Sequence, residues 1–269
     1  MFNKKIYFLH IPKTAGKFIS HNIKNKLVKE NIPHYISTHF PNDNRFLHSK
    51  VYISAHAGTF IIDEIPDIDV ATMLREPVSA RASYFNFIYP FYLKDREEYK
   101  NINGDKEKFL YYLFEDKNFL THNNYQSRFL CNSADSRSWD LKKFYEESQA
   151  EMMEKYKNGL AFDWFVGNEN TSLDLAMKKV KEFNIVNTVD RVDLFCERVN
   201  NWFIENYDIS IEFNFNQKIN VGVSEFNNKK TSSDYFINLL NKKEKEKILE
   251  LNNIDFEIYN FVKNMEKSL

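Results

Sequence analysis

Two lysines flank a turn of small residues near the start of the sequence. Residues 12–17 read Pro-Lys-Thr-Ala-Gly-Lys and directly follow an apolar run over residues 5–11. A strand that ends in such a turn and leads into a helix presents several backbone amides at the positive end of the helix dipole, which binds phosphate or sulfate. Lys13 and Lys17 add positive charge to this place. The pattern predicts a local anion site; an ordinary turn with two surface lysines is the alternative.

A second candidate anion site combines Arg75 with Ser83. Arg75 directly follows the strand candidate at residues 69–74, and Pro77 is suited to the first turn of a helix. Ser83 follows eight residues after Arg75, near the second turn of that helix. A guanidinium and a hydroxyl that converge there can hold a phosphate by charge-assisted hydrogen bonds. Taken singly, Arg75 also fits a surface ion pair with Glu76 or another carboxylate, and Ser83 fits an ordinary helix position.

The candidates for a general base are the seven histidines, because a neutral imidazole accepts a proton near neutral pH. His56 ends the strand candidate at residues 51–56 and is followed by Ala57 and Gly58. It is therefore expected at the carboxyl edge of a parallel sheet, where such folds bind ligands. His10, just before the first turn, is the second candidate. For either histidine, a hydrogen-bonded structural role is the alternative.

The elements that position these residues alternate between strands and helices. Residues 5–11 predict a strand and residues 15–30 a helix. Further strands are predicted at residues 34–38, 51–56, 69–74 and 164–167. Further helices are predicted after Pro77, over much of residues 95–156, from about residue 171, at residues 190–206 and from residue 233 to the end. This order predicts an α/β fold with a central parallel sheet flanked by helices. Without repeats or a long linker, residues 1–269 are expected to form a single domain.

Composition limits the possible partners. The formal net charge is -1 and 43% of the 269 residues are hydrophobic, so the chain should fold and has no overall basic character to attract nucleic acid. The two cysteines are too few for a disulfide framework or a four-thiolate metal site. The apolar stretch 6–11 is far shorter than the ~20 residues needed to span a bilayer. We expect a soluble, cytoplasmic protein with no transmembrane segment and no metal.

The first turn departs from the Walker A loop and resembles another phosphate-binding loop. No glycine lies five residues before Gly16, and Phe18 stands where a magnesium-binding Ser or Thr would be. Residues 8–16, Phe-Leu-His-Ile-Pro-Lys-Thr-Ala-Gly, instead closely resemble the 5'-phosphosulfate loop of the carbohydrate sulfotransferases, which include the heparan sulfate 2-O and 6-O enzymes. The resemblance implies a P-loop-like sulfotransferase fold in which Lys13 contacts the leaving phosphate. It also implies a donor loop of Lys13, Thr14, Ala15, Gly16, Lys17 and Phe18.

Other parts of the sequence extend the resemblance. Arg, an acidic residue, Pro and then Ser at the eighth position are similar to the 3'-phosphate site of the family, with Arg75 and Ser83 as the ligands. An arginine expected five residues after Arg75 is replaced by Ala80, with Arg81 one place later. The position of His56 between the two motifs matches the catalytic base of the family. Residues 124–130 and 165–169 resemble later segments of the family, and residues 219–231 resemble its carboxyl-terminal loop, which makes Lys230 a donor-binding candidate.

The resemblance implies a sulfotransferase that moves a sulfuryl group from 3'-phosphoadenosine 5'-phosphosulfate (PAPS) to a hydroxyl. The expected acceptor is a carbohydrate or a precursor of a surface glycan, with His56 and Lys13 as the catalytic residues and no metal. Two other classes stay open. A P-loop-like kinase or other phosphotransferase would need ATP and magnesium. A non-catalytic nucleotide-binding or glycan-binding module would keep the fold without the chemistry.

Overall fold

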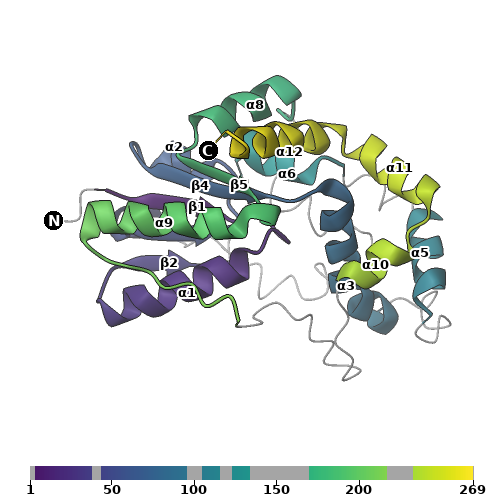
Figure 1. Cartoon of the computed structure of the whole chain (residues 1–269), viewed down its shortest axis with the longest axis horizontal. Helices are drawn as coiled ribbons and strands as arrows, with labels where there is room; N and C mark the ends of the chain where they lie inside the picture. Colours follow the sequence, from purple (N-terminus) through teal and green to yellow (C-terminus); the bar gives the residue numbers. More distant parts are fainter. Residues whose placement is uncertain are drawn as a thin grey trace.

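A computed structural model shows an α/β protein (Figure 1) and describes residues 4–37, 44–95, 105–115, 123–133, 170–216 and 233–268. The strand expected at residues 164–167, a large part of the helical region expected at residues 95–156, and Lys230 lie outside these ranges. None of the helices in these ranges combines the length and the hydropathy that a membrane-spanning helix needs.

The centre of the described structure is a sheet of five parallel strands, which confirms the predicted fold class and is consistent with a P-loop-like α/β fold. The strand order is β2-β3-β1-β4-β5. The strands are β1 (Ile6–Leu9), β2 (His34–Ile36), β3 (Tyr52–Ala55), β4 (Asp69–Leu74) and β5 (Ile185–Thr188). The first four lie within the predicted ranges. The fifth was not predicted, because its four residues end in the polar pair Asn187 and Thr188.

Helices connect the strands and cover both faces of the sheet. The α-helices of the described residues are α1 (Gly16–Lys29), α2 (Phe60–Glu64), α3 (Pro77–Asp95), α5 (Lys106–Glu115), α6 (Tyr125–Cys131), α8 (Leu173–Glu182), α9 (Val192–Tyr207), α10 (Ser233–Leu239), α11 (Lys242–Leu251) and α12 (Asn253–Glu266). Short 3₁₀ turns occur at Asn44–Ser49 and Val189–Arg191. The helices predicted at residues 15–30, from about residue 171 and at residues 190–206 are therefore confirmed as α1, α8 and α9.

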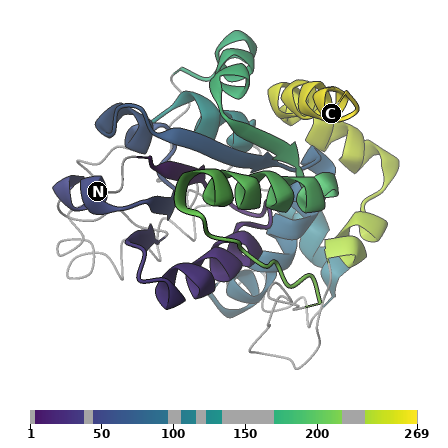
Figure 2. The ribbon, with the colours of Figure 1, turned by 60° about the vertical axis from the view of Figure 1, so that its left-hand side comes forward.

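Alternating side chains of β1 separate two hydrophobic layers. Ile6 and Phe8 pack with α1 and α9 on one face, whereas Tyr7 and Leu9 pack with residues of α2, α6, α8 and α12 on the other. Figures 1 and 2 show α1 and α9 together on one side of the sheet and α8 and α12 on the opposite side. All four residues of β1 are buried, which explains why this strand is a continuous apolar run. A third hydrophobic cluster joins α3, α5, α10 and α11 beyond the end of the sheet.

The strand order places three predicted segments at one edge of the sheet. In the register of the sheet, Leu9 lies level with Ala55 of β3 and with Thr72 of β4. The chain leaves β1 and β3 at this level, through His10 and His56, and leaves β4 after Leu74, through Arg75, at the same edge of the sheet. The carboxyl ends of adjacent parallel strands form the usual ligand crevice of open α/β sheets.

Candidate functional site

The loop after β1 has the backbone conformation of an anion site. Lys13 and Ala15 have positive φ angles of 69° and 64°, a left-handed conformation that is unfavourable for residues with a side chain. Two hydrogen bonds hold this conformation: the Thr14 hydroxyl donates to the Ile11 carbonyl at 2.7 Å, and the Tyr125 hydroxyl donates to the Pro12 carbonyl at 3.3 Å. Among the described residues, the backbone N–H groups of residues 14–17 have no acceptor. These amides at the start of α1 are therefore available to an anion.

Gly16 is required by close packing against the ring of His10. A Cβ built on Gly16 would lie 1.9 Å from Cδ2 and 2.0 Å from Nε2 of His10, where no side chain can fit. The ring of His10 also stacks on that of Phe8, with the two planes only 9° apart. The loop folds back over the ring of His10, and this contact restricts position 16 to glycine.

Three cations gather around the loop. The Arg75 guanidinium donates from Nη1 to the carbonyl oxygen of Lys13 at 3.2 Å, which ties the segment after β4 to the loop after β1. Burial, followed by the charges of Lys17 and Arg75, lowers the pKa of Lys13 to about 8. The charges with the largest influence on Lys13 are thus other cations, an arrangement that an anion would stabilise.

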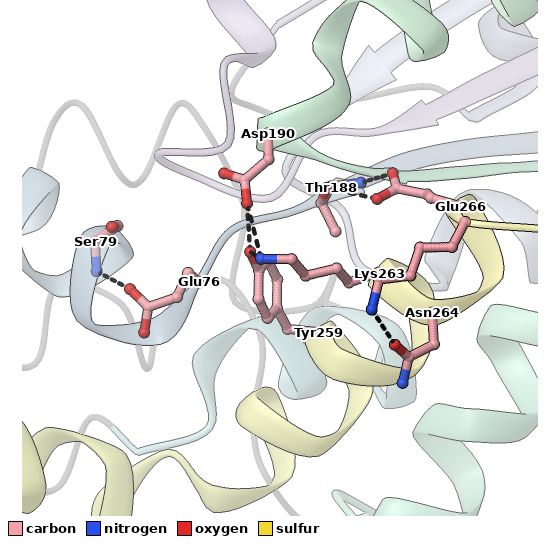
Figure 3. Close-up of polar contacts among 9 residues, drawn as sticks. Glu76, Ser79, Thr188, Asp190, Tyr259, Lys263, Asn264 and Glu266 are labelled. Atoms are coloured by element: carbon pink, nitrogen blue, oxygen red, sulfur yellow. Dashed lines mark hydrogen bonds and ion pairs between the residues drawn. The ribbon is translucent and has the colours of Figure 1, made fainter.

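Glu76, the residue after Arg75, caps α3. Its carboxylate oxygens accept hydrogen bonds from the backbone N–H groups of Val78 at 2.9 Å and Ser79 at 2.7 Å. Figure 3 shows the contact with Ser79 at the start of the helix. The negative charge lies at the positive end of the helix dipole, a stabilising position. The carboxylate of Glu76 is therefore engaged by the first turn of α3.

Gln126 of α6 holds the backbone of Arg75 from the opposite side. Its Oε1 accepts the Arg75 N–H at 2.8 Å, and its Nε2 donates to the Arg75 carbonyl, also at 2.8 Å. Gln126 is fully buried, and its own N–H donates to the Asp255 carboxylate at 3.1 Å. Residues 124–130 were noted in the sequence only for a family resemblance. The structure shows that this segment fixes the position of Arg75.

Helix α3 turns the face that bears Ser83 and Phe87 toward the loop. The ammonium of Lys13 lies 4.9 Å from the centre of the Phe87 ring, within the range of a cation–π contact. Ser83 is half-buried and lies one helical turn before Phe87, hence on the same face. Ser83 therefore shares a helix face with Phe87, the residue of α3 that contacts Lys13 of the loop.

Arg81 has a different environment from Arg75 and Ser83. It is buried, and its Nη2 donates to Oδ1 of Asn252 at 3.3 Å. Its guanidinium also lies 5.4 Å from the centre of the Tyr125 ring. These contacts link α3 to α6 and to the start of α12, so the structure gives Arg81 a role in packing.

The two histidine candidates form a single pair. Nε2 of His56 and Nδ1 of His10 lie 3.1 Å apart, and the rings meet edge to face with centroids 4.3 Å apart. Burial, followed by the charges of Lys17 and Lys13, lowers the pKa of His10 to about 4. His10 is therefore neutral near pH 7. His56 is half-buried, and Phe129 of α6 lies beside its ring.

An aromatic surface next to the loop was not predicted. Phe18 lies 6.2 Å from Phe213 and 5.4 Å from Phe215, measured between ring centroids. Asn22 of α1 holds the segment that contains Phe213 and Phe215 by accepting the N–H of Asn214 at 3.1 Å. Phe215 is 56% exposed, an unusual exposure for a large apolar ring. The sequence around residues 209–216 has no clear period, and only the fold brings it beside Phe18.

No protein-family model matches the chain. No curated protein matches its sequence either. In the parts of the chain that the structure describes, no group of three His, Cys, Asp or Glu side chains is arranged to hold a metal ion. The functional assignment therefore depends on the loop, its cations and the histidine pair.

Proposed function

We propose that this protein is a sulfotransferase that moves a sulfuryl group from PAPS to a hydroxyl of a carbohydrate acceptor. The observation that carries the proposal is the convergence of two cationic segments on one sheet edge. The loop after β1 offers amides with Lys13 and Lys17, and the segment after β4 brings Arg75 into contact with that loop. A nucleotide with phosphate groups on both its 5' and 3' positions matches two such anchors.

Each anchor has a role in donor binding. The 5'-phosphosulfate would lie against the amides of residues 14–17, with Lys13 and Lys17 balancing its charge. The 3'-phosphate would be held by Arg75 and Ser83. Phe18 and the exposed ring of Phe215, whose planes are 37° apart, offer apolar ring faces on which the adenine can stack, as bases do on aromatic side chains. Lys230 remains a candidate ligand from the resemblance alone.

Transfer would proceed by in-line displacement. His56 accepts the proton of the acceptor hydroxyl while that oxygen forms a bond to sulfur. The bond between sulfur and the oxygen of the 5'-phosphate breaks, and 3'-phosphoadenosine 5'-phosphate leaves. Negative charge grows on the departing phosphate, and Lys13 with the loop amides stabilises it. We place the reaction in the cytoplasm, on a precursor of a surface glycan.

The rival assignment to an ATP-dependent phosphotransferase is less well supported. Phe18 occupies the position at which a Walker A loop has its magnesium-binding hydroxyl, although the parallel sheet suits both classes. A site that binds only the 5'-phosphates of ATP would also leave Arg75 and the face of α3 that bears Ser83 without a role.

The proposal is tested by following the label from ³⁵S-PAPS into a set of mono- and oligosaccharides, beside a parallel reaction with γ-³²P-ATP and magnesium. We expect ³⁵S transfer, and we expect Lys13→Ala to lower its rate roughly 100- to 1000-fold, the usual effect of removing one preorganised electrostatic group. Lys24→Ala, an exposed lysine on α1, is the matched control and should keep the full rate. Transfer of ³²P without transfer of ³⁵S would instead assign the protein to the phosphotransferases.

A further inference from the structure

Asp255 is a fully buried carboxylate in the first turn of α12, and the proposed reaction does not use it. It accepts three hydrogen bonds from the start of α6. The backbone N–H of Gln126 donates to Oδ2 at 3.1 Å, and the backbone N–H and the hydroxyl of Ser127 both donate to Oδ1, at 2.7 Å and 2.5 Å. The carboxylate therefore caps α6 from another helix, because these amides lie in a first turn that leaves them without helical acceptors.

The start of α6 caps α12 in return. Asn124, the residue before α6, accepts with its Oδ1 the N–H groups of Ile254 at 2.9 Å and of Asp255 at 3.3 Å. The φ angle of Asn124 is 48°, a left-handed conformation in which asparagine is more frequent than most residues. Its own N–H donates to Oδ1 of Asn252 at 3.0 Å. The two helices cap each other, so a shift of either start breaks hydrogen bonds of both.

The same part of the chain, residues 252–255, also holds α3. Oδ1 of Asn252 accepts a hydrogen bond from Nη2 of Arg81, which lies two residues before Ser83 on α3. On the other side, Gln126 of α6 holds the backbone of Arg75 with two hydrogen bonds. Residues 252–255 are therefore connected to both proposed ligands of the 3'-phosphate, to one through α6 and to the other through α3.

The burial of a carboxylate at this place is costly, which favours a role beyond stability. Desolvation raises the pKa of Asp255, while its hydrogen bonds with α6 and the charge of Arg81 act in the opposite direction. A buried charge often adds little net stability, because its contacts mainly offset the loss of hydration. The carboxylate does provide two acceptor oxygens that fix where the first turn of α6 lies.

We propose that Asp255 is a positioning residue that sets the preference of the site for a 3'-phosphate. It fixes the first turn of α6, and Gln126 of that turn fixes the backbone of Arg75. Arg75 is thereby held beside the loop after β1, where it donates to the carbonyl of Lys13. Because Asp255 is fully buried, it acts through Gln126 and not on the ligand. This role rests on the proposed donor, in which the 3'-phosphate binds Arg75 and Ser83.

A second buried carboxylate on α12 supplies a matched control. Glu266, at the other end of the helix, accepts the backbone N–H and the hydroxyl of Thr188 (Figure 3), as Asp255 does those of Ser127. Asp255→Asn and Glu266→Gln each replace one carboxylate oxygen with an NH₂ group, so both should lower the free energy of unfolding. Only Asp255→Asn should also loosen Arg75.

The first measurement needs no ligand. Hydrogen exchange of the Arg75 amide, followed by ¹⁵N NMR, reports on the bond that this N–H donates to Gln126. Relative to the amides of β1, we expect exchange at Arg75 to be at least about tenfold faster in Asp255→Asn than in Glu266→Gln.

The second measurement is calorimetric titration with 3'-phosphoadenosine 5'-phosphate and with ADP. Asp255→Asn should weaken binding of the 3'-phosphorylated nucleotide roughly tenfold and binding of ADP by less than about threefold. Glu266→Gln should keep the preference of the wild type. A merely structural role would change both nucleotides and both variants alike.

The outcomes separate the positioning role from the function. Faster exchange at Arg75 in Asp255→Asn, with a wild type that binds both nucleotides equally, would support the role and reject the proposed donor. Equal exchange in the two variants would overturn the role, and so would a preference for the 3'-phosphate that Asp255→Asn keeps in full. If Asp255→Asn fails to fold, Asn124→Gly keeps the left-handed backbone, removes the return contact to α12 and should show both changes. Their absence in that variant would also contradict the role.

Discussion

At the scale of single residues, Gly16 illustrates why the loop motif contains a glycine. No side chain fits at this position because the ring of His10 already occupies the space: a Cβ on Gly16 would lie 1.9 Å from that ring. We predict that Gly16→Ala lowers the free energy of unfolding by about 1–3 kcal/mol, because overpacking forces the ring or the loop to move. It should also weaken anion binding, because the displaced loop loses its amide geometry. Chemical denaturation and calorimetry measure the two effects.

The cause can be isolated by removing the ring. In a His10→Ala background, Gly16→Ala should be neutral or slightly stabilising, because alanine is the better helix former. An equal loss of stability in both backgrounds would contradict the packing explanation.

Which site residues the sequence could reveal depends on how far apart in the chain their partners lie. Lys13, Gly16, Arg75 and His56 were predicted because each belongs to a short motif that follows a strand. Gln126 could not be recognised, since it acts on the backbone of a residue 51 positions away. His10 pairs with His56 because β1 and β3 are adjacent in the sheet, and this adjacency could not be predicted from the sequence.

At the scale of elements, α6 positions the segment after β4. Two hydrogen bonds join the side chain of Gln126 to the backbone of Arg75, and Gln126 is fully buried. We predict that Gln126→Met lowers the free energy of unfolding by about 2 kcal/mol, because a buried donor and acceptor lose their partner. It should also weaken binding of 3'-phosphoadenosine 5'-phosphate, because Arg75 is no longer held. Denaturation and calorimetric titration are the measurements.

A second buried amide serves as control. Asn187 of β5 donates to Glu266 at 3.0 Å and accepts from Arg198 at 3.1 Å. Glu266 also accepts from the N–H and hydroxyl of Thr188, as Figure 3 shows for the Thr188 contacts. Asn187→Leu should destabilise the protein to a similar extent but leave nucleotide affinity unchanged. Equal weakening of binding by both variants would mean that the effect comes from lost stability alone.

The same comparison explains the strand that the sequence did not reveal. Ile185–Thr188 is only four residues long, and half of it is polar. It is a strand because Glu266, from the end of α12, satisfies its polar groups 78 residues later in the chain. By contrast, β1 was predicted because burial on both faces makes it a continuous apolar run.

At the scale of the whole molecule, the sheet brings together the groups of the candidate site, which no single segment contains. β1 supplies the loop, β3 supplies His56, β4 supplies Arg75, and the segment after α9 supplies the aromatic surface. The fold class was predicted from the alternation of strands and helices. The convergence of the four segments depends on the strand order, which local patterns do not determine.

The most direct test of the central claim is a calorimetric comparison of 3'-phosphoadenosine 5'-phosphate, ADP, and ATP with magnesium, on the wild type and on Arg75→Ala. Arg191→Ala, in which an exposed arginine paired with Asp193 is removed, is the matched control. The account predicts that the 3'-phosphate strengthens binding to the wild type at least tenfold relative to ADP, since a charge-assisted hydrogen bond contributes about 1.5–3 kcal/mol. Arg75→Ala should abolish this preference, and Arg191→Ala should keep it. Equal affinity for the 3'-phosphorylated nucleotide and ADP, or tighter binding of ATP with magnesium that is unaffected by Arg75→Ala, would contradict the account.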